Sequence, residues 1–388
     1  MITKSDLMEL MDLSNRHVLF EKLLLTLKGF ASLDKINYYE YTTSEGKIPI
    51  VIIADSPNDF DIKYVKLFVG AQHNEYNGLF GMIEVLNQFK DLILSGGKIF
   101  NNHQIMIFAP LMNPFGFLNP RLDNKSGYFI KNGTNLNRYW RRTFAPDFEN
   151  GDEDLKNLPI PEHAKIIKDL LNRFWGSEEA QIYIIDFHET SLIERFSSEL
   201  NENLKRESVT YKFNHWLKEG IVYNVIKLYN IKFTRKPLFY KCTPQADHTH
   251  INMTIKQLEE VCEKLQEYIF MNEGKLPFYF CYSNRSKEFC ERLAHNVYNK
   301  MKPILWETYF PAFNHSFNNH GCFVNMNDAI ERKGLYSIEL ETPKQFFNIF
   351  DEIEKSKSDM NYFENKIRAM NMSIKLVVES IKEMLTLY

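Results

Sequence analysis

The fold of this chain is limited above all by five runs of apolar, β-rich sequence separated by segments with helical spacing. The β-rich runs are 48–56, 64–72, 103–116, 180–191 and 334–343. Segments 77–97 and 159–176 carry apolar residues at helical spacing, and both end on glycine, a common helix stop. Apolar strands that alternate with helices are typical of a sheet covered on both faces. We therefore expect an α/β fold with a mixed, mostly parallel central sheet and helices on both faces.

The stretch from about 192 to 310 has a different character. It is richer in charged segments with helical spacing, such as 255–270 and 287–301. A chain of 388 residues exceeds the size of about 250–300 residues at which a single core stops growing, so its length predicts one large domain with insertions or two domains. We expect one domain over 1–388, with an inserted helical subdomain at about 192–310. The first 30 residues predict one or two amphipathic helices, because acidic residues interrupt any secretion signal.

Composition excludes several classes of partner. The net charge is −3, and acidic and basic residues are mixed along the chain, so we expect neither nucleic acid nor an anionic membrane as partner. There is no run of 18 apolar residues, so we expect no membrane-spanning helix. Five scattered cysteines without C-x-x-C spacing predict reduced thiols and a cytoplasmic protein. A small molecule or a peptide is the class of ligand that composition does not exclude.

Four groups of polar residues follow the predicted strands at the points where these strands end. The groups are 70–76 (GAQHNEY), 113–116 (NPFG) with 134–138 (TNLNR), 185–190 (IDFHET) and 337–343 (SIELETP). In an open α/β sheet, ligands bind just beyond the carboxyl ends of the strands. Polar side chains at these positions are therefore candidates for a functional site.

In this order, the four groups resemble the zinc carboxypeptidases and their relatives, the aspartoacylase and succinylglutamate desuccinylase group. That family has a G-x-H-x-x-E metal motif after a strand and an N-P-[DG]-G turn. An arginine, an Asn-Arg pair, a D-x-H third ligand and a late catalytic glutamate follow. The resemblance covers roughly residues 40–190 and 312–345. It implies a metal-dependent hydrolase that holds one zinc ion per chain.

The resemblance implies Glu75 and His188 as zinc ligands and leaves the first ligand open between two residues. An ungapped match puts Gln72 at the place of the family's first histidine, while His73 lies one residue closer to Glu75 than the family spacing. We favour Gln72, bound through its amide oxygen, because some peptidoglycan-trimming D,L-carboxypeptidases have a similar Gln-x-x-Glu motif. Asp186, two residues before His188 on the same strand face, could orient that ligand.

Asn137 and Arg138 resemble the family's clamp for a terminal carboxylate, which arginine can bind through two parallel hydrogen bonds. Arg121 resembles the arginine that polarises the scissile carbonyl. The general base is Glu341 or Glu339, whose side chains share one face of a strand. We favour Glu341, because matching the family's strand to 336–341 puts it at the catalytic position.

The resemblance implies hydrolysis of an amide bond next to a free carboxylate, as in a metallocarboxypeptidase. A murein-derived peptide is the substrate that the Gln-type motif favours. Two alternatives stay open. The first is an N-acyl amino acid deacylase of the desuccinylase kind, which shares the Asn-Arg pair. The second is a catalytically silent relative that binds a peptide, which the missing histidine favours.

Overall fold

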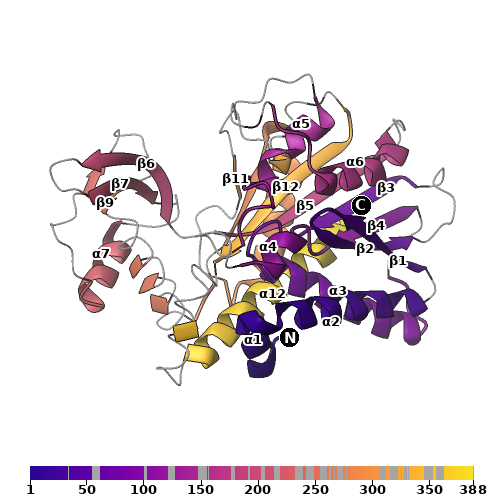
Figure 1. Cartoon of the computed structure of the whole chain (residues 1–388), viewed down its shortest axis with the longest axis horizontal. Helices are drawn as coiled ribbons and strands as arrows, with labels where there is room; N and C mark the ends of the chain where they lie inside the picture. Colours follow the sequence, from indigo (N-terminus) through magenta and orange to yellow (C-terminus); the bar gives the residue numbers. More distant parts are fainter. Residues whose placement is uncertain are drawn as a thin grey trace. The chain divides into compact units, whose positions relative to one another are not determined.

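A computed structural model covers the chain, and its described residues form two compact units (Figure 1). The first unit comprises 1–189, 279–301 and 311–388, and the second comprises 190–278 and 302–310. The described residues are 1–33, 35–54, 62–99, 103–120, 127–146, 155, 157–175, 180–190, 193–201, 206–213, 219–231, 239–241, 249–253, 260–261, 264–265, 267–268, 274–276, 278–305, 312–314, 322–324, 326, 330, 332–344, 353–354 and 362–387.

An eight-stranded sheet is the centre of the first unit. Its strands are β1 (Ile36–Thr43), β2 (Gly46–Ala54), β3 (Tyr64–Val69), β4 (Gln104–Ala109), β5 (Gln181–Thr190), β10 (Tyr279–Tyr282), β11 (Ala312–Asn314) and β12 (Leu335–Pro343). Their order across the sheet is β1-β2-β4-β3-β5-β12-β10-β11. The five apolar runs form β2, β3, β4, β5 and β12, as predicted.

The middle of the sheet is parallel. Strand β3 runs parallel to both β4 and β5. Strand β12 runs the same way as β5, because Ile182 N–H donates to Gly334 O near the start of both strands and Thr342 Oγ1–H donates to His188 O near their ends. Antiparallel pairs join β1 to β2, β2 to β4 and β10 to β12, whereas β11 is parallel to β10. The predicted mixed, mostly parallel sheet is confirmed.

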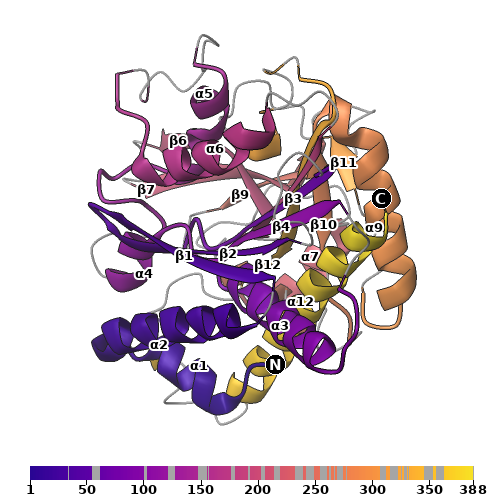
Figure 2. The same cartoon turned by 90° about the vertical axis from the view of Figure 1, so that its right-hand side faces the viewer.

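Helices cover both faces of this sheet, as predicted. In Figure 2, α5 and α6 lie above the sheet, and α1, α2, α3 and α12 lie below it. The helices are α1 (Lys4–Met11), α2 (Arg16–Gly29), α3 (Asn77–Leu94), α4 (Pro114–Leu118), α5 (Trp140–Phe144), α6 (Glu162–Trp175), α9 (Lys287–Met301) and α12 (Tyr362–Thr386). Short 3₁₀ turns are η1 (Leu13–Asn15), η2 (Phe30–Ser32), η4 (Leu136–Arg138) and η7 (Asn284–Ser286). Helices α3 and α12 approach closely at Gly81, where a Cβ atom would lie 2.4 Å from Val377 Cγ1.

The buried strand β3 illustrates why continuous apolar runs indicate a covered sheet. Alternate side chains point to opposite faces of a strand. Val65, Leu67 and Val69 belong to the same apolar core as Ile167 of α6. Phe68, which points the other way, stacks on the ring of Phe108 with centroids 5.0 Å apart. Both faces of the strand are therefore buried, and neither needs polar residues.

The second unit differs from the expected helical subdomain. Its described residues form a four-stranded antiparallel sheet in the order β6-β7-β9-β8, together with helix α7. The elements are β6 (Ile193–Asn201), β7 (Arg206–Phe213), α7 (Glu219–Leu228), β8 (Phe239–Lys241) and β9 (Thr249–Met253). The frequent charged residues in 193–213 conceal the strand pattern. Segment 287–301 is helical as predicted, but this helix, α9, belongs to the first unit, where it packs against α12 and β10.

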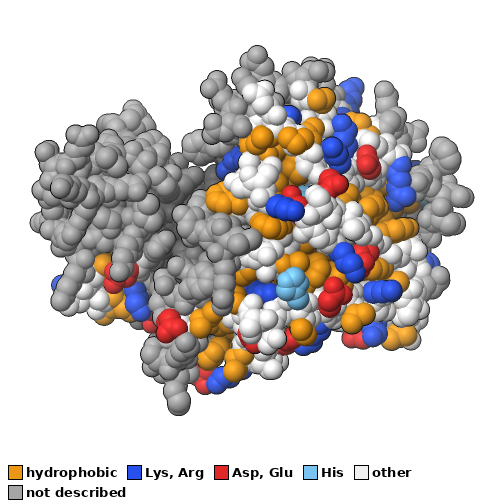
Figure 3. Space-filling model, in the orientation of Figure 1, with side chains coloured by type: hydrophobic (Ala, Val, Ile, Leu, Met, Phe, Trp, Pro, Cys, Tyr) orange, Lys and Arg blue, Asp and Glu red, His pale blue; other side chains and the backbone are white. Residues whose placement is uncertain are grey.

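On the face drawn in Figure 3, side chains of Lys and Arg are interspersed with those of Asp and Glu, so neither sign of charge dominates it. Among the described residues, no helix combines the length and the hydropathy that crossing a membrane would require.

Candidate metal site

Three parallel strands end at one edge of the sheet and bring the predicted site residues together. In the pairing of β3 with β5, Val69 lies opposite Asp186, so the segment after β3 lies beside His188. The hydroxyl of Thr342 donates to the carbonyl oxygen of His188 at 3.3 Å, which puts Glu341 of β12 at the same edge. The edge therefore collects polar side chains from three distant parts of the sequence.

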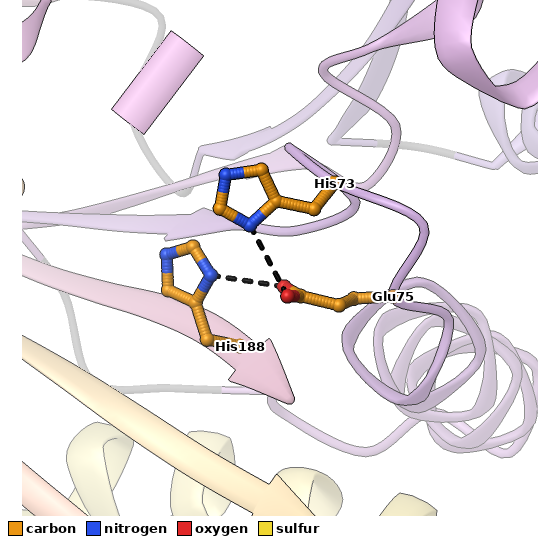
Figure 4. A group of neighbouring side chains, drawn as sticks. All are labelled: His73, Glu75 and His188. Carbon is orange, nitrogen blue, oxygen red and sulfur yellow. Dashed lines mark hydrogen bonds and ion pairs between the residues drawn. The ribbon is translucent and has the colours of Figure 1, made fainter. Parts of the chain in front are cut away.

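His73, Glu75 and His188 converge at this edge, as Figure 4 shows. Nδ1 of His73 lies 3.1 Å from Oε1 of Glu75, and Nδ1 of His188 lies 2.9 Å from Oε2 of the same carboxylate. All three side chains are buried, with exposed fractions of 4 to 6%. One ligand atom from each residue lies within 4.8 Å of the other two. Two imidazole nitrogens and a carboxylate therefore face one point.

Asn135 fixes the tautomer of His73. The backbone N–H of Asn137 donates to Oδ1 of Asn135 at 2.8 Å, so the atom at that position must be the oxygen. Nε2 of His73 lies 2.8 Å from the same oxygen and must therefore carry the hydrogen. Burial lowers the pKa of His73, although Glu75 opposes this effect, and a neutral ring follows. Its Nδ1 lone pair points toward Glu75.

Asp186 fixes the tautomer of His188. Oδ2 of Asp186 lies 2.9 Å from Nε2 of His188, and a carboxylate can only accept, so Nε2 donates to it. Nδ1 of His188 therefore faces Glu75. A carboxylate behind a histidine ligand is the usual way in which proteins fix the ring and raise its basicity toward a metal. The structure gives Asp186 the orienting position that its spacing from His188 predicts.

Gln72, the favoured first ligand, has both ends of its amide engaged elsewhere. Nε1–H of Trp140 donates to Oε1 of Gln72 at 2.6 Å, and Nε2–H of Gln72 donates to Oδ2 of Asp186 at 2.6 Å. Indole nitrogen is only a donor, so the amide oxygen must face Trp140. Ala71, with a left-handed φ of 47°, turns the chain just before Gln72. The extended chain of β3 therefore ends before Gln72, and the hydrogen bonds of the Gln72 amide favour His73 as the first ligand.

The donor set fits a divalent metal ion. Catalytic zinc sites hold three nitrogen or carboxylate ligands and keep a fourth position for water. Burial would raise the pKa of Glu75, but the imidazoles of His73 and His188 outweigh it and lower the pKa, so Glu75 is an anion. Burial would lower the pKa of His188, but Asp186 and Glu75 raise it well above its ordinary value. A proton on Nδ1 of His188 thus occupies the place that a cation would take, and binding of a metal would release it.

Glu339 and Glu341 project from one face of β12, and they lie differently toward His188. Glu339 groups with Asp186 and His188, within 4.8 Å, whereas His73 and Glu75 form a separate group with His188. The pKa of Glu341 is raised well above its ordinary value by burial and by the nearby carboxylates of Glu339 and Glu75, while His188 opposes the rise. Oε2 of Glu341 and Oε1 of Glu339 are buried without a hydrogen-bond partner among the described residues.

Asn137 and Arg138 lie in η4, beside the convergent ligands. Nδ2 of Asn137 lies 3.2 Å from Nε2 of His188. Burial raises the pKa of Tyr128, and the charge of Arg138 opposes this rise. The charge of Arg138 also opposes the rise that burial causes in the pKa of Glu339. Asn137 therefore contacts the ligand His188, and Arg138 follows Asn137 in the same turn. Arg121, the predicted carbonyl-polarising residue, lies outside the described residues.

Sequence reasoning missed two residues that contact His73 or Gln72. The ring of Tyr128 stacks on His73 with centroids 4.0 Å apart and an angle of 12° between the planes. Trp140 anchors Gln72 and stacks on Phe323 at 4.0 Å. No motif marks either aromatic residue. Asn135, in contrast, lies inside the quoted TNLNR run, and its spacing from Asn137 could have indicated a role.

No protein-family profile and no curated protein matches this sequence. A metallo-carboxypeptidase from Burkholderia cenocepacia is similar in structure, with a TM-score of 0.47 and 10% identity over 94% of this chain and 68% of that one. A metallo-carboxypeptidase from Pseudomonas aeruginosa, in complex with (2-guanidinoethylmercapto)succinic acid, gives 0.46 and 11% over 94% and 67%. Bovine thrombin-activatable fibrinolysis inhibitor gives 0.47 and 9% over 96% and 95%. Similarities this weak carry no argument about function, which therefore depends on the site itself.

Proposed function

We propose that this chain is a zinc-dependent hydrolase of the metallocarboxypeptidase kind, with His73, Glu75 and His188 as ligands. The convergence of Nδ1 of His73, Nδ1 of His188 and one carboxylate on a single point carries the proposal. Two neutral imidazoles and one carboxylate give a zinc site a net charge of about +1, which suits a catalytic ion. Such an ion would lower the pKa of water and polarise a carbonyl group.

Glu341 is the proposed general base. It lies at the carboxyl end of β12, and the charge of Glu75 acts on it, so it is near the convergent ligands. Its raised pKa suits a group that takes a proton from attacking water and then gives it to the leaving amine. Glu339 is the weaker candidate, since it groups with Asp186 and His188, and the group of convergent ligands His73, Glu75 and His188 does not include it.

Arg138 and Asn137 are proposed to bind the free carboxylate of the substrate. Arg138 is half-buried at the end of η4, and Asn137 is buried against the ring of His188. A guanidinium can bind a carboxylate through two parallel hydrogen bonds and so fix the amide bond next to it. Arg121 remains the proposed residue that stabilises the oxyanion. The expectation of a murein-derived peptide depended on Gln72 as a metal ligand, and the hydrogen bonds of Gln72 to Trp140 and Asp186 remove that support.

The test compares matched substrates on zinc-loaded protein. We expect cleavage of peptides with a free C-terminal carboxylate, much slower cleavage of the same peptides as C-terminal amides, and loss of activity after chelation. Glu341→Gln should bind zinc normally and lower kcat by about 100-fold or more. Cleavage that survives complete removal of the metal would contradict the proposal.

Substrate profiling also separates the alternatives. Rapid hydrolysis of N-acyl amino acids with no peptide cleavage would identify a deacylase of the desuccinylase kind. Tight binding of peptides with no turnover of either substrate class, by a zinc-loaded protein, would identify a silent relative.

A further inference from the structure

One buried network joins the residues that directly follow the site residues. Glu189 follows the ligand His188, and Tyr76 and Asn77 follow the ligand Glu75. Oε1 of Glu189 accepts the backbone N–H of Tyr76 at 2.8 Å and that of Asn77 at 2.9 Å. The side chain of Glu189 is buried, with 5% exposed. The carboxylate thus connects the chain after one ligand to the chain after the other, across more than a hundred residues of sequence.

These two hydrogen bonds also cap helix α3. Tyr76 is the N-cap residue, and its own side chain makes no capping hydrogen bond. The first N–H groups of a helix have no partner within the helix, and the positive end of its dipole favours an anion. Glu189, which lies in strand β5, supplies both the hydrogen-bond acceptor and the negative charge at the start of α3. The start of α3, and with it the position of Glu75, therefore depends on β5.

The network continues to the strand of the proposed base. Nδ2 of Asn77 donates to Oγ1 of Thr342 at 3.0 Å, and the hydroxyl of Thr342 donates to the carbonyl oxygen of His188 at 3.3 Å. Thr342 directly follows Glu341. The side chains of Asn77 and Thr342 are both buried. The three segments that carry Glu75, His188 and Glu341 are thus tied together by polar contacts just behind the site.

We infer that Glu189 is a positioning residue that holds Glu75 and His188 at the separation that a metal ion needs. This inference relies on the proposed zinc site. Glu189 acts through the backbone, because it follows the ligand His188 and accepts the N–H groups of Tyr76 and Asn77, which follow the ligand Glu75. Residues that orient metal ligands typically change metal affinity by about 10- to 100-fold when they are removed.

Two conservative variants separate positioning from simple charge. Glu189→Gln keeps the length of the side chain and an acceptor oxygen but loses the charge, whereas Glu189→Asp keeps the charge but withdraws the oxygen. Positioning predicts zinc affinity near that of the wild type for Glu189→Gln and a loss of about 10-fold or more for Glu189→Asp and Glu189→Ala. Zinc affinity is measured by chelator competition, and the visible absorption of the Co²⁺ form reports the ligand geometry. The reverse order, with Glu189→Asp unaffected and Glu189→Gln weakened, would overturn the inference.

Thr3→Ala is the matched control. Thr3 caps helix α1 through the N–H of Asp6, far along the chain from the site, and should lower thermal stability without altering the Co²⁺ spectrum. If the wild type binds no zinc, the proposed function fails, and hydrogen exchange of the metal-free protein then decides the inference. Faster exchange in Glu189→Asp confined to residues 72–79 and 186–190 would support it. An unchanged exchange pattern would overturn it.

Discussion

Oδ1 of Asn135 lies 2.8 Å from Nε2 of His73 and so directs the other ring nitrogen, Nδ1, toward Glu75. The same oxygen accepts the backbone N–H of Asn137, which leaves no choice of amide orientation. One asparagine side chain therefore determines which nitrogen of His73 can bind a metal.

Removal of the Asn135 side chain should weaken metal binding. Asn135→Ala leaves Nε2 of His73 without its acceptor, so the ring loses its fixed tautomer and orientation. We expect zinc affinity to fall by about 10- to 100-fold and Asn135→Asp to restore most of it. Asn132→Ala is the control, because Asn132 accepts from Thr134 in the same loop without touching His73. Equal zinc affinity in Asn135→Ala and Asn132→Ala would show that the tautomer does not matter.

Zinc affinity should rise with pH. The pKa of metal-free His188 lies well above its ordinary value, because Asp186 and Glu75 outweigh the effect of burial. Below that raised pKa, zinc must displace a proton from Nδ1, so apparent affinity should increase by about 10-fold per pH unit. Above it, the slope should flatten. Calorimetric titration in buffers of different ionisation enthalpy counts the protons released, and a count of zero at pH 7 would exclude the proposed role of His188.

Arg138→Lys should raise KM for substrates that carry a free carboxylate. An ammonium cannot reproduce the two parallel hydrogen bonds of a guanidinium, so we expect an increase of about 10-fold with a smaller change in kcat. Amide-capped peptides provide the internal control, since they lack the carboxylate. In the Arg138→Lys variant the two substrates should differ less in rate than in the wild type. A wild type that cleaves both equally would disprove the clamp.

The buried Lys66 makes a separate prediction about stability. Its Nζ donates to Met384 O at 2.9 Å near the end of α12, and burial lowers its pKa to about 7. Between pH 7 and its unfolded pKa near 10.5, the unfolded chain binds one more proton than the folded one. Wild-type stability should therefore gain up to about 1.4 kcal/mol per pH unit over this range relative to Lys66→Met.

At pH 6, where Lys66 is charged in both states, Lys66→Met should be the more stable protein by about 1–3 kcal/mol. Urea unfolding at pH 6, 7.5 and 9 measures the difference. Lys63→Met is the control, because Lys63 is exposed and directly precedes strand β3. A difference that does not change with pH would mean that Lys66 is not buried as a neutral amine.

The fold followed from sequence because its strands are buried on both faces. In the strand 64–69, Leu67 and Phe68 point to opposite faces, and both can be buried only if the sheet is covered on both faces. The sheet of the second unit was not predicted because its strands carry many charged residues. In 193–213 these residues conceal the alternation of apolar and polar residues that is typical of a strand. Strong periodicity is readable from sequence, whereas a polar sheet is not.

The site was predictable in part. Glu75, His188 and Asp186 lie where strand ends and spacing indicate. The choice between Gln72 and His73 depends on the left-handed φ of 47° at Ala71 and on an indole donor from Trp140. Both are tertiary features that the local motif does not record.

Metal content of two alanine variants, measured beside the wild type, tests the central claim most directly. The geometry predicts about one zinc per chain in the wild type, loss of zinc in His73→Ala and retention in Gln72→Ala. Gln72→Ala should lose only the hydrogen bonds to Trp140 and Asp186, with at most a modest fall in affinity. Retention of zinc in His73→Ala together with its loss in Gln72→Ala would contradict the account and make the amide of Gln72 the first ligand.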